Sequence, residues 1–305
     1  KFVALPNPWP KPVLNDLIAL IGAGRSMIRV FEALDQDGLI EKWIPEWSHV
    51  RFLPQRNVLH RHTVDRHMLE TAVHAANLTR TVTRPDLLLV SALFHDIGKG
   101  FPNKDHSEYG EELIRPLAKR LGFDAKDSEL IALLVREHLL LSAVATRRDL
   151  EDPATIAFVV EKIKDPEALQ LLHALSISDG EATGKSAWSD WKAGLVANLV
   201  SKCLAAMAGI KPVSEPDLIP SGILTEEISI KMVNNTDGQS AQENIEIEII
   251  AQDQIGLLSA VAGLMTISRF NVRSAKTRTT NGIAVMRWIV ELDANAQLPS
   301  AEKLT

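Results

Sequence analysis

The most informative stretch of this sequence is Leu93-Phe94-His95-Asp96-Ile97-Gly98-Lys99-Gly100. It ends a nearly unbroken apolar run that begins at Leu87, two residues after Pro85. This run predicts a buried helix with proline in its first turn. Buried polar groups need partners, so an imidazole beside a carboxylate at the end of such a helix is poorly suited to packing alone. The stretch therefore predicts that the helix carries ligands for a divalent cation.

The composition is that of a globular protein with more than one domain. The 305 residues, 46% of them hydrophobic, suffice for two cores. A net charge of −6 and a pI near 5.9 argue against a nucleic-acid-binding protein, which would usually have a clustered basic surface. No apolar run approaches the roughly 20 residues of a membrane-spanning helix, and the N-terminus lacks a signal-peptide pattern. The single cysteine, Cys203, predicts a buried thiol in a reducing compartment, so we expect a cytoplasmic protein.

Periodic apolar patterns predict a helical domain over residues 51–209, preceded at 1–50 by an N-terminal arm and further helices. The predicted helices lie at 13–21, 26–34, 38–44, 63–78, 87–94, 107–121, 127–141 and 187–208. Two more begin at the cap-and-proline pairs Asp152-Pro153 and Asp165-Pro166, and the second is expected to end near Asp179. Thr63 and Ser107 are the expected caps of their helices.

The pattern changes at residue 210, where three prolines between 212 and 220 predict a stiff linker that runs to 243 and contains a short strand. Alternating apolar residues predict strands at 228–232 and 245–249, each with one solvated face. A helix at 256–267 and strands at 271–277 and 283–292 follow, with a hairpin turn at Asn281-Gly282. One more helix is expected to open at Pro299. We expect a smaller α+β domain over 244–305.

Six polar residues of the helical domain sit on or beside different predicted helices: His67, His95, Asp96, His106, His138 and Asp179. A helical bundle builds a metal site from inward-facing side chains of this kind. Mixed imidazole and carboxylate ligands suit Mn, Fe or Zn, or Mg at the carboxylate-rich end, as one ion or two. Such a cation lowers the pKa of a bound water and neutralises phosphate oxygens. The pattern therefore predicts a metal-dependent phosphohydrolase.

Cationic side chains near this site are candidates for binding the substrate phosphate. Lys99 follows His95 and Asp96 closely, and we expect these three residues to take part in catalysis. Arg147 and Arg148 could also bind phosphate, although a solvated loop explains the arginines at least as well. Four other histidines are expected to be packed or solvent-facing, namely His60, His62, His74 and His173.

This order of residues resembles the HD-domain metal-dependent phosphohydrolases. The resemblance implies that one metal ion is held by His67, His95, Asp96 and Asp179. It also implies that His106 and His138 serve a second metal ion or the substrate phosphate. The helical domain at 51–209 would then be an all-α HD domain.

A narrower resemblance links the chain to the bifunctional PII uridylyltransferase/uridylyl-removing enzymes. It rests on the stretch around His95 and on these segments: Asp105-His106-Ser107, Leu134 to Ser142, Arg147-Arg148-Asp149 and Asp152-Pro153. The segment from Ile250 to Leu258 resembles the opening of an ACT domain, which follows the HD domain in that family. One departure is Ile255, where the ACT pattern usually has proline, so this loop should be less rigid. The resemblance covers the chain from about Phe31 onwards.

The family implies removal of UMP, or of AMP in adenylylating relatives, from a tyrosine of the nitrogen-signalling protein PII. It also implies a ferredoxin-like βαββαβ ACT domain, of which about four elements are recognisable, with glutamine as effector. The expected effector residues are Asp253, Gln254, Gly256 and Leu257, because free backbone N–H groups at a helix start can receive a carboxylate. A tight strand-to-helix turn explains Gly256 equally well. The family's nucleotidyl-transferring domain has no counterpart in this sequence, so we expect no nucleotide attachment.

Three other readings stay open. A guanosine tetraphosphate hydrolase also combines HD and ACT domains, but it would be expected to show a short acidic pair where this chain has Ile97-Gly98-Lys99. A cyclic-dinucleotide phosphodiesterase of the HD-GYP kind would show Gly-Tyr-Pro, which does not occur. The chain could instead be a catalytically silent sensor that binds metal or amino acid and docks PII.

Overall fold

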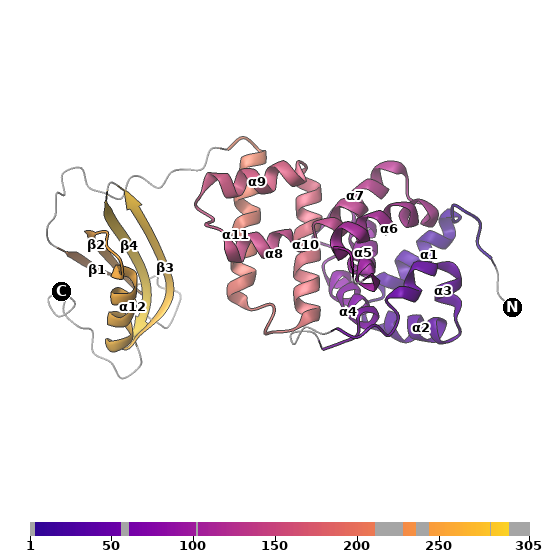
Figure 1. Ribbon diagram of the computed structural model, residues 1–305, viewed down its shortest axis with the longest axis horizontal. Helices are drawn as coiled ribbons and strands as arrows, with labels where there is room; N and C mark the ends of the chain where they lie inside the picture. Colours follow the sequence, from indigo (N-terminus) through magenta and orange to yellow (C-terminus); the bar gives the residue numbers. More distant parts are fainter. Residues whose placement is uncertain are drawn as a thin grey trace. The chain divides into compact units, whose positions relative to one another are not determined.

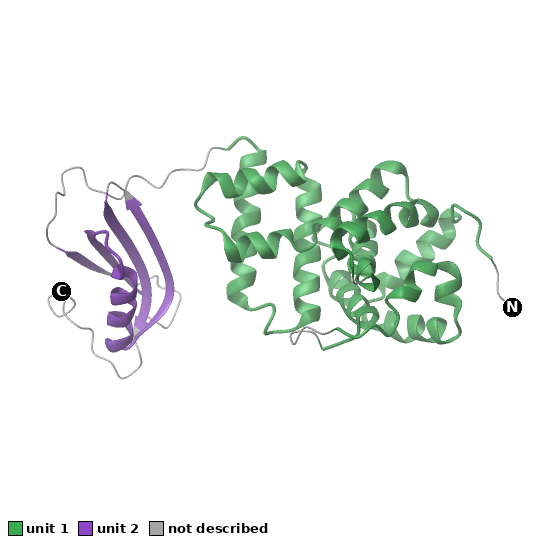
Figure 2. Ribbon diagram, in the orientation of Figure 1, with its two compact units in different colours: residues 1–212 green, residues 213–305 purple. Residues whose placement is uncertain are grey.

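The structure, a computed structural model, describes residues 4–55, 61–101, 103–210, 228–235, 244–280 and 282–292. It divides the chain into two compact units, residues 1–212 and 213–305 (Figure 2). Among the helices of the described segments, none is both long enough and apolar enough to cross a membrane.

The first unit is helical (Figure 1). Its elements are α1 (Lys11–Gly22), α2 (Arg25–Gln36), α3 (Leu39–Trp43), η1 (Pro45–His49), α4 (Val64–Asn77), α5 (Pro85–Phe94), η2 (Ile97–Gly100), α6 (His106–Leu121), α7 (Ala125–Arg136), α8 (Leu140–Arg147), α9 (Pro153–Ile163), α10 (Pro166–Thr183) and α11 (Asp190–Met207). The helices before residue 50 share one hydrophobic core with those that follow. The predicted all-helical character of this region is confirmed.

Helix α5 lies at the centre of this core. Every residue from Leu87 to Phe94 is buried, and α1, α4, α7 and α10 all contact it. A helix that is apolar on all sides must be surrounded in this way, because each of its faces has to leave water. The end of α5 is consequently held in place from several directions, and this fixes His95 and Asp96.

Three details of the helical prediction were wrong at helix ends. The expected helix at 127–141 is two helices, because α7 ends at Arg136 and α8 begins at Leu140. Ser107 does not cap α6; the carboxylate of Asp105 does, accepting from the backbone N–H groups of Ser107 and Glu108 at 2.9 and 3.0 Å. An aspartate is favoured at this position because its charge also interacts with the helix dipole.

The third difference concerns α10, which continues past Asp179 to Thr183. Asp179 therefore lies inside the last turn of the helix and does not follow its end. At the start of α4, Thr63 occupies the predicted cap position, but its side chain makes no capping hydrogen bond.

The second unit contains an antiparallel sheet with one helix against it. The strands β1 (Ser229–Asn235), β2 (Asn244–Gln252), β3 (Phe270–Thr280) and β4 (Ile283–Leu292) lie in the order β1-β2-β4-β3. Helix α12 (Leu257–Ile267) buries Leu257, Val261 and Met265 against the alternate residues of β2 and β4. The predicted α+β character is confirmed.

The sheet also includes a strand that was expected in the linker. Strand β1 pairs antiparallel with β2 along its whole length, from Ser229 opposite Ile250 to Asn235 opposite Asn244. The segment β2-α12-β3-β4 supplies the four recognisable elements, while the helix expected at Pro299 lies outside the described residues, as does Asn281 of the hairpin turn. The ferredoxin-like order of elements therefore stays a prediction.

Candidate metal centre

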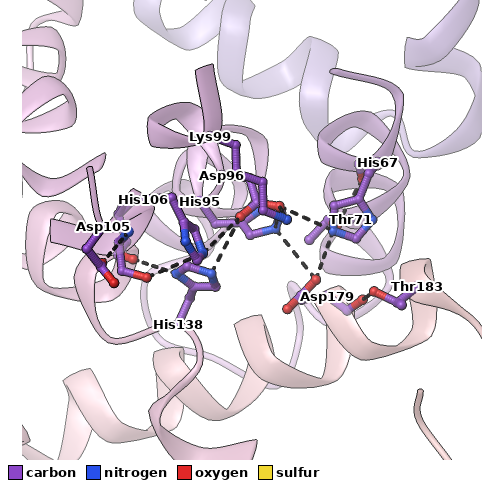
Figure 3. A network of polar contacts seen from close by, with 12 residues as sticks. His67, Thr71, His95, Asp96, Lys99, Asp105, His106, His138, Asp179 and Thr183 are labelled. Carbon is purple, nitrogen blue, oxygen red and sulfur yellow. Dashed lines mark hydrogen bonds and ion pairs between the residues drawn. The ribbon is translucent and has the colours of Figure 1, made fainter. Parts of the chain in front are cut away.

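Five places in the helical unit direct imidazole or carboxylate groups towards one another (Figure 3). The side chains are His67 from α4, His95 and Asp96 from the end of α5, His106 from the start of α6, His138 from between α7 and α8, and Asp179 from α10. Four of them are buried, and His106 and Asp179 are partly buried. The structure thus brings together all six residues that the sequence singled out as metal ligands.

One group of contacts surrounds His67 and His95. Asp179 Oδ1 lies 2.9 Å from His67 Nε2 and 3.5 Å from His95 Nε2. Asp96 Oδ2 lies 3.3 Å from His95 Nε2 and 3.8 Å from His67 Nε2. Each of the two carboxylates therefore faces both imidazoles. Two nitrogen and two oxygen atoms placed in this way suit a single divalent cation.

The other carboxylate oxygen of Asp96 faces a second pair of histidines. Asp96 Oδ1 is 3.6 Å from His138 Nε2 and 3.9 Å from His106 Nε2. The ligand atoms of Asp96, His106 and His138 all lie within 4.8 Å of one another, as do those of His67, His95 and Asp96. Asp96 lies between the two groups, so the geometry accommodates one ion or two.

Two of the histidines are oriented by the helix ends on which they sit. The Nδ1 atom of His95 is 2.9 Å from the carbonyl oxygen of Ala92, and that of His138 is 2.7 Å from the carbonyl oxygen of Val135. A carbonyl oxygen only accepts, so Nδ1 carries the proton in both rings and Nε2 points into the cluster. The bond from His138 reaches the carbonyl to which Leu139 N–H would donate if α7 continued, so a side chain bonds to the backbone where the helix divides.

The cluster is strongly coupled electrostatically. Burial lowers the pKa of His95, but the nearby carboxylates of Asp96 and Asp179 outweigh it and raise the pKa to about 10. Burial raises the pKa of Asp96, yet the charges of His95 and Lys99 hold it well below its ordinary value. The pKa of Asp179 is likewise held well below its ordinary value, against burial, by its hydrogen bond with His67 and by the nearby charge of His95.

The pKa values of His106 and His138 shift in the opposite direction to that of His95. Burial lowers the pKa of His138 to about 4, despite the opposing charge of Asp96. Burial also lowers the pKa of His106, and the charge of Lys99 adds to this effect. Both imidazoles are therefore neutral near pH 7, which is the form that binds metals.

Two buried polar atoms without hydrogen-bond partners also suggest that a divalent cation completes the cluster. The buried atoms His95 Nε2 and Asp96 Oδ1 have no hydrogen-bond partner within the described chain. Unpartnered buried polar atoms are costly, and they are expected where a ligand completes the site. The two carboxylates of the cluster also favour a positive charge between them.

Lys99 belongs to the same cluster. Its Nζ lies 2.6 Å from Asp96 Oδ2, and it also donates to Gln55 Oε1 at 3.0 Å. Sequence reasoning missed Gln55, since a single glutamine outside any periodic pattern carries no signal.

The two predicted phosphate-binding arginines are not brought to the cluster in the described residues. Arg147 and Arg148 are exposed at the end of α8. The guanidinium of Arg148 lies over the ring of Phe158, with its Cζ atom 4.1 Å from the ring centre. A phosphate-binding role for them stays a prediction.

In the second unit, the predicted effector residues form the turn between β2 and α12. Asp253 N–H donates to the carbonyl of Gly282 at 2.8 Å, and Leu257 N–H donates to that of Gln254 at 3.1 Å. Gly256 has a φ of 92°, a left-handed conformation that glycine adopts without strain. No side chain caps α12. These facts agree with a tight turn, and they leave helix N–H groups uncapped by side chains.

Comparison with known proteins shows which family the helical unit is similar to. Residues 64–171 match the HD domain family, and this range contains His67, His95, Asp96, His106 and His138. Over 289 residues the chain is 45% identical to the bifunctional uridylyltransferase/uridylyl-removing enzyme of Mycobacterium tuberculosis, which covers 94% of this chain and 35% of that protein. This chain is homologous to those enzymes. The resemblance predicted from the sequence motifs is confirmed.

Two further proteins of the same name are also similar to this chain. The enzyme of the same name from Streptomyces coelicolor is 38% identical over 347 residues, covering 98% of this chain and 41% of that protein. The one from Corynebacterium glutamicum is 35% identical over 186 residues, covering 61% of this chain and 27% of that protein. The chain spans about a third of the length of the curated relatives it matches. Asp179 lies eight residues beyond the HD match, yet it contacts His67.

Proposed function

We propose that the helical unit is a metal-dependent hydrolase that removes UMP, or AMP, from a tyrosine of PII. The observation that carries this proposal is the convergence of His67, His95, Asp96 and Asp179 from three helices, with two buried ligand-type atoms unpartnered. Homology to enzymes named as uridylyl-removing supports the choice of reaction. The single free and buried Cys203 is compatible with a reducing cytoplasm as the place of action.

The residues have distinct roles in this proposal. His67, His95, Asp96 and Asp179 would hold the first divalent ion, and His106 and His138 would hold a second ion together with Asp96. The metal would be Mn, Mg, Fe or Zn, and it would supply an activated water and positive charge for the phosphate oxygens. Lys99 uses two of its three N–H groups for Asp96 and Gln55, and it would donate the third to an oxygen of the same phosphate.

The substrate bond suits such a site. It is a phosphodiester whose leaving group is a phenolate with a conjugate-acid pKa of about 10, so departure needs less proton donation than an alkoxide would. The main barrier is the approach of an anionic nucleophile to an anionic phosphorus. Cationic and hydrogen-bonding groups fixed around the phosphate lower that barrier without having to reorganise.

We also propose that the second unit is an ACT domain that senses glutamine. The run β2-α12-β3-β4 agrees with the opening of the ACT pattern. Glutamine carries a carboxylate, which the uncapped start of α12 beside Gly256 could receive. Ile255 is fully exposed at the position where proline is usual, so we expect a weaker effector site than the family pattern would give.

The test of the hydrolase is release of UMP from uridylylated PII by the purified chain with Mn²⁺, compared with the His95→Ala, Asp96→Ala double variant. We expect release to fall by at least about a thousandfold in the variant, because both groups of contacts lose Asp96. His74→Ala is a matched control, since His74 is also on α4 but pairs with Glu181 outside the cluster.

Helicity measured by circular dichroism should be unchanged in both variants. Adenylylated PII and guanosine tetraphosphate serve as competing substrates. Equal release by the double variant and the unmodified chain would contradict the proposal, and so would a chain that binds Mn²⁺ but releases no nucleotide.

A further inference from the structure

Gln55 contacts the candidate metal centre from outside the set of predicted ligands. Its Oε1 accepts a hydrogen bond from Lys99 Nζ at 3.0 Å, and the same nitrogen lies 2.6 Å from Asp96 Oδ2. Lysine can only donate, so the amide atom that faces it must be the oxygen. The amide nitrogen of Gln55 therefore points away from Lys99. That Nε2 atom is buried and has no hydrogen-bond partner in the described part of the chain.

The position of Gln55 is fixed by the segment that precedes it. Phe52 N–H donates to Asp65 Oδ2 at 2.8 Å, and Val64 N–H donates to the carbonyl of Leu53 at 2.8 Å. Arg51 is anchored as well, through its Nε atom, to Asp35 Oδ2 at 2.8 Å. Asp65 and Val64 lie in the first turn of α4, the helix that carries His67. The same helix start therefore holds both a cluster histidine and the segment that ends in Gln55.

An unpaired buried amide is unfavourable unless a ligand completes it. Lys99 Nζ has three N–H groups, of which Gln55 and Asp96 accept two. Within the described residues, one N–H of Lys99 and the amide N–H groups of Gln55 are thus donors without acceptors beside the cluster. A phosphate oxygen carries no proton in a phosphodiester, so it can only accept, and it matches these donors.

We propose that Gln55 Nε2 donates a hydrogen bond to a non-bridging oxygen of the substrate phosphodiester, while Gln55 Oε1 holds Lys99 in place to contact the same phosphate. The inference rests on the hydrolase function proposed above. A neutral amide adds a hydrogen bond without a second positive charge. This pairing suits the single negative charge of a diester better than the nearly double charge of a phosphate monoester.

The test uses the Mn²⁺-loaded full chain with the 4-nitrophenyl ester of UMP, a phosphodiester with a phenolic leaving group. Gln55→Glu keeps an oxygen for Lys99 but removes the donor, and Gln55→Ala removes both. We expect kcat/KM to fall by about tenfold to a hundredfold in both variants, the range for a hydrogen bond to a charged group. Gln170→Glu makes the same charge change at an exposed position of α10 and should leave kcat/KM unchanged.

Mn²⁺ affinity, measured by titration calorimetry, separates this role from a structural one. Both Gln55 variants should bind Mn²⁺ as the unmodified chain does, because Gln55 is not among the six ligand-type residues. Wild-type kcat/KM in Gln55→Glu would overturn the inference, and so would loss of Mn²⁺ binding in Gln55→Ala.

The two proposals fail in different ways. An inactive His95→Ala, Asp96→Ala variant beside fully active Gln55 variants would keep the hydrolase and remove the role of Gln55. If the unmodified chain hydrolyses no ester, the hydrolase proposal fails first. Calorimetric binding of UMP to the Mn²⁺-loaded chain then decides the inference: weaker binding in Gln55→Glu supports it, and equal binding overturns it.

Discussion

Asp96 is the one residue of the cluster that contacts both groups of ligand-type side chains. Its Oδ2 atom faces His67, His95 and Lys99, while its Oδ1 atom faces His106 and His138. A carboxylate that offers one oxygen to each side can bridge two cations, whereas each imidazole can serve only one. Substitutions at Asp96 and at His138 should therefore have different consequences for metal binding.

We expect the unmodified chain to bind about two Mn²⁺ ions and His138→Gln about one, because only the second group loses a ligand. Asp96→Asn should bind neither ion tightly, since both groups lose a negatively charged ligand. Titration calorimetry or elemental analysis after dialysis measures the stoichiometry. A count of one ion in both His138→Gln and the unmodified chain would show that one ion alone occupies the cluster.

The sequence identified the residues that converge in the cluster, because their types and order are unusual; their role as metal ligands stays a prediction. A His-Asp pair at the end of an apolar helix has few roles other than binding a cation, and the four other residues recur on separate helices. Gln55 could not be found in the same way. Glutamine is mostly exposed in proteins. Gln55 is linked to the cluster only by its hydrogen bond with Lys99, which is 44 residues away in the sequence. The arginines at 147 and 148 are a suggestive pair that no contact among the described residues joins to the cluster, so their phosphate-binding role stays a prediction.

Helix ends, more than helix middles, build this centre. His95 follows the last residue of α5, His106 is the first residue of α6, and His138 lies between α7 and α8. Periodicity finds the middle of a helix reliably, but its ends depend on caps and side-chain hydrogen bonds. The hydrogen bond from His138 Nδ1 to the carbonyl of Val135 lies at such a helix end. The apolar pattern continues on both sides of it, so periodicity does not show the break between α7 and α8.

The packing of η2 against α6 can be tested through Gly98. A Cβ atom there would overlap the carbonyl oxygen of His106 and lie 2.7 Å from the backbone nitrogen of Gly110. Neither backbone can yield without moving the start of α6, so Gly98→Ala should displace His106. We expect a fall in Tm of about 5 °C or more and weaker binding of the second Mn²⁺ ion. Gly194→Ala, at a helix position with open space around it, is the control and should be neutral or slightly stabilising. Unchanged Tm and stoichiometry in Gly98→Ala would contradict this packing.

At the scale of the whole molecule, the two units have separate cores. One cluster of buried apolar residues runs from Trp9 to Cys203, and another from Ile245 to Val290. The change from a helical to an alternating apolar pattern predicts this division from the sequence. The pairing of β1 with β2 was not foreseen, because three prolines and a polar stretch made its surroundings resemble a linker. Pairing between strands is a property of the assembled sheet, and a five-residue alternation does not specify it.

Separate cores predict that hydrolysis survives without the second unit. All six cluster residues and Gln55 lie before residue 212, and the helical core closes without residues beyond Cys203, so a chain ending at residue 212 should fold alone. We expect it to keep its helicity and to release UMP from uridylylated PII at a rate within about threefold of the full chain. It should lose any response to glutamine, because the start of α12 is gone. Release rates of both chains with and without glutamine measure this.

A truncated chain that stays folded and binds Mn²⁺ but no longer releases UMP would show that the second unit contributes to the reaction. A truncated chain that still responds to glutamine would place the effector site in the helical unit.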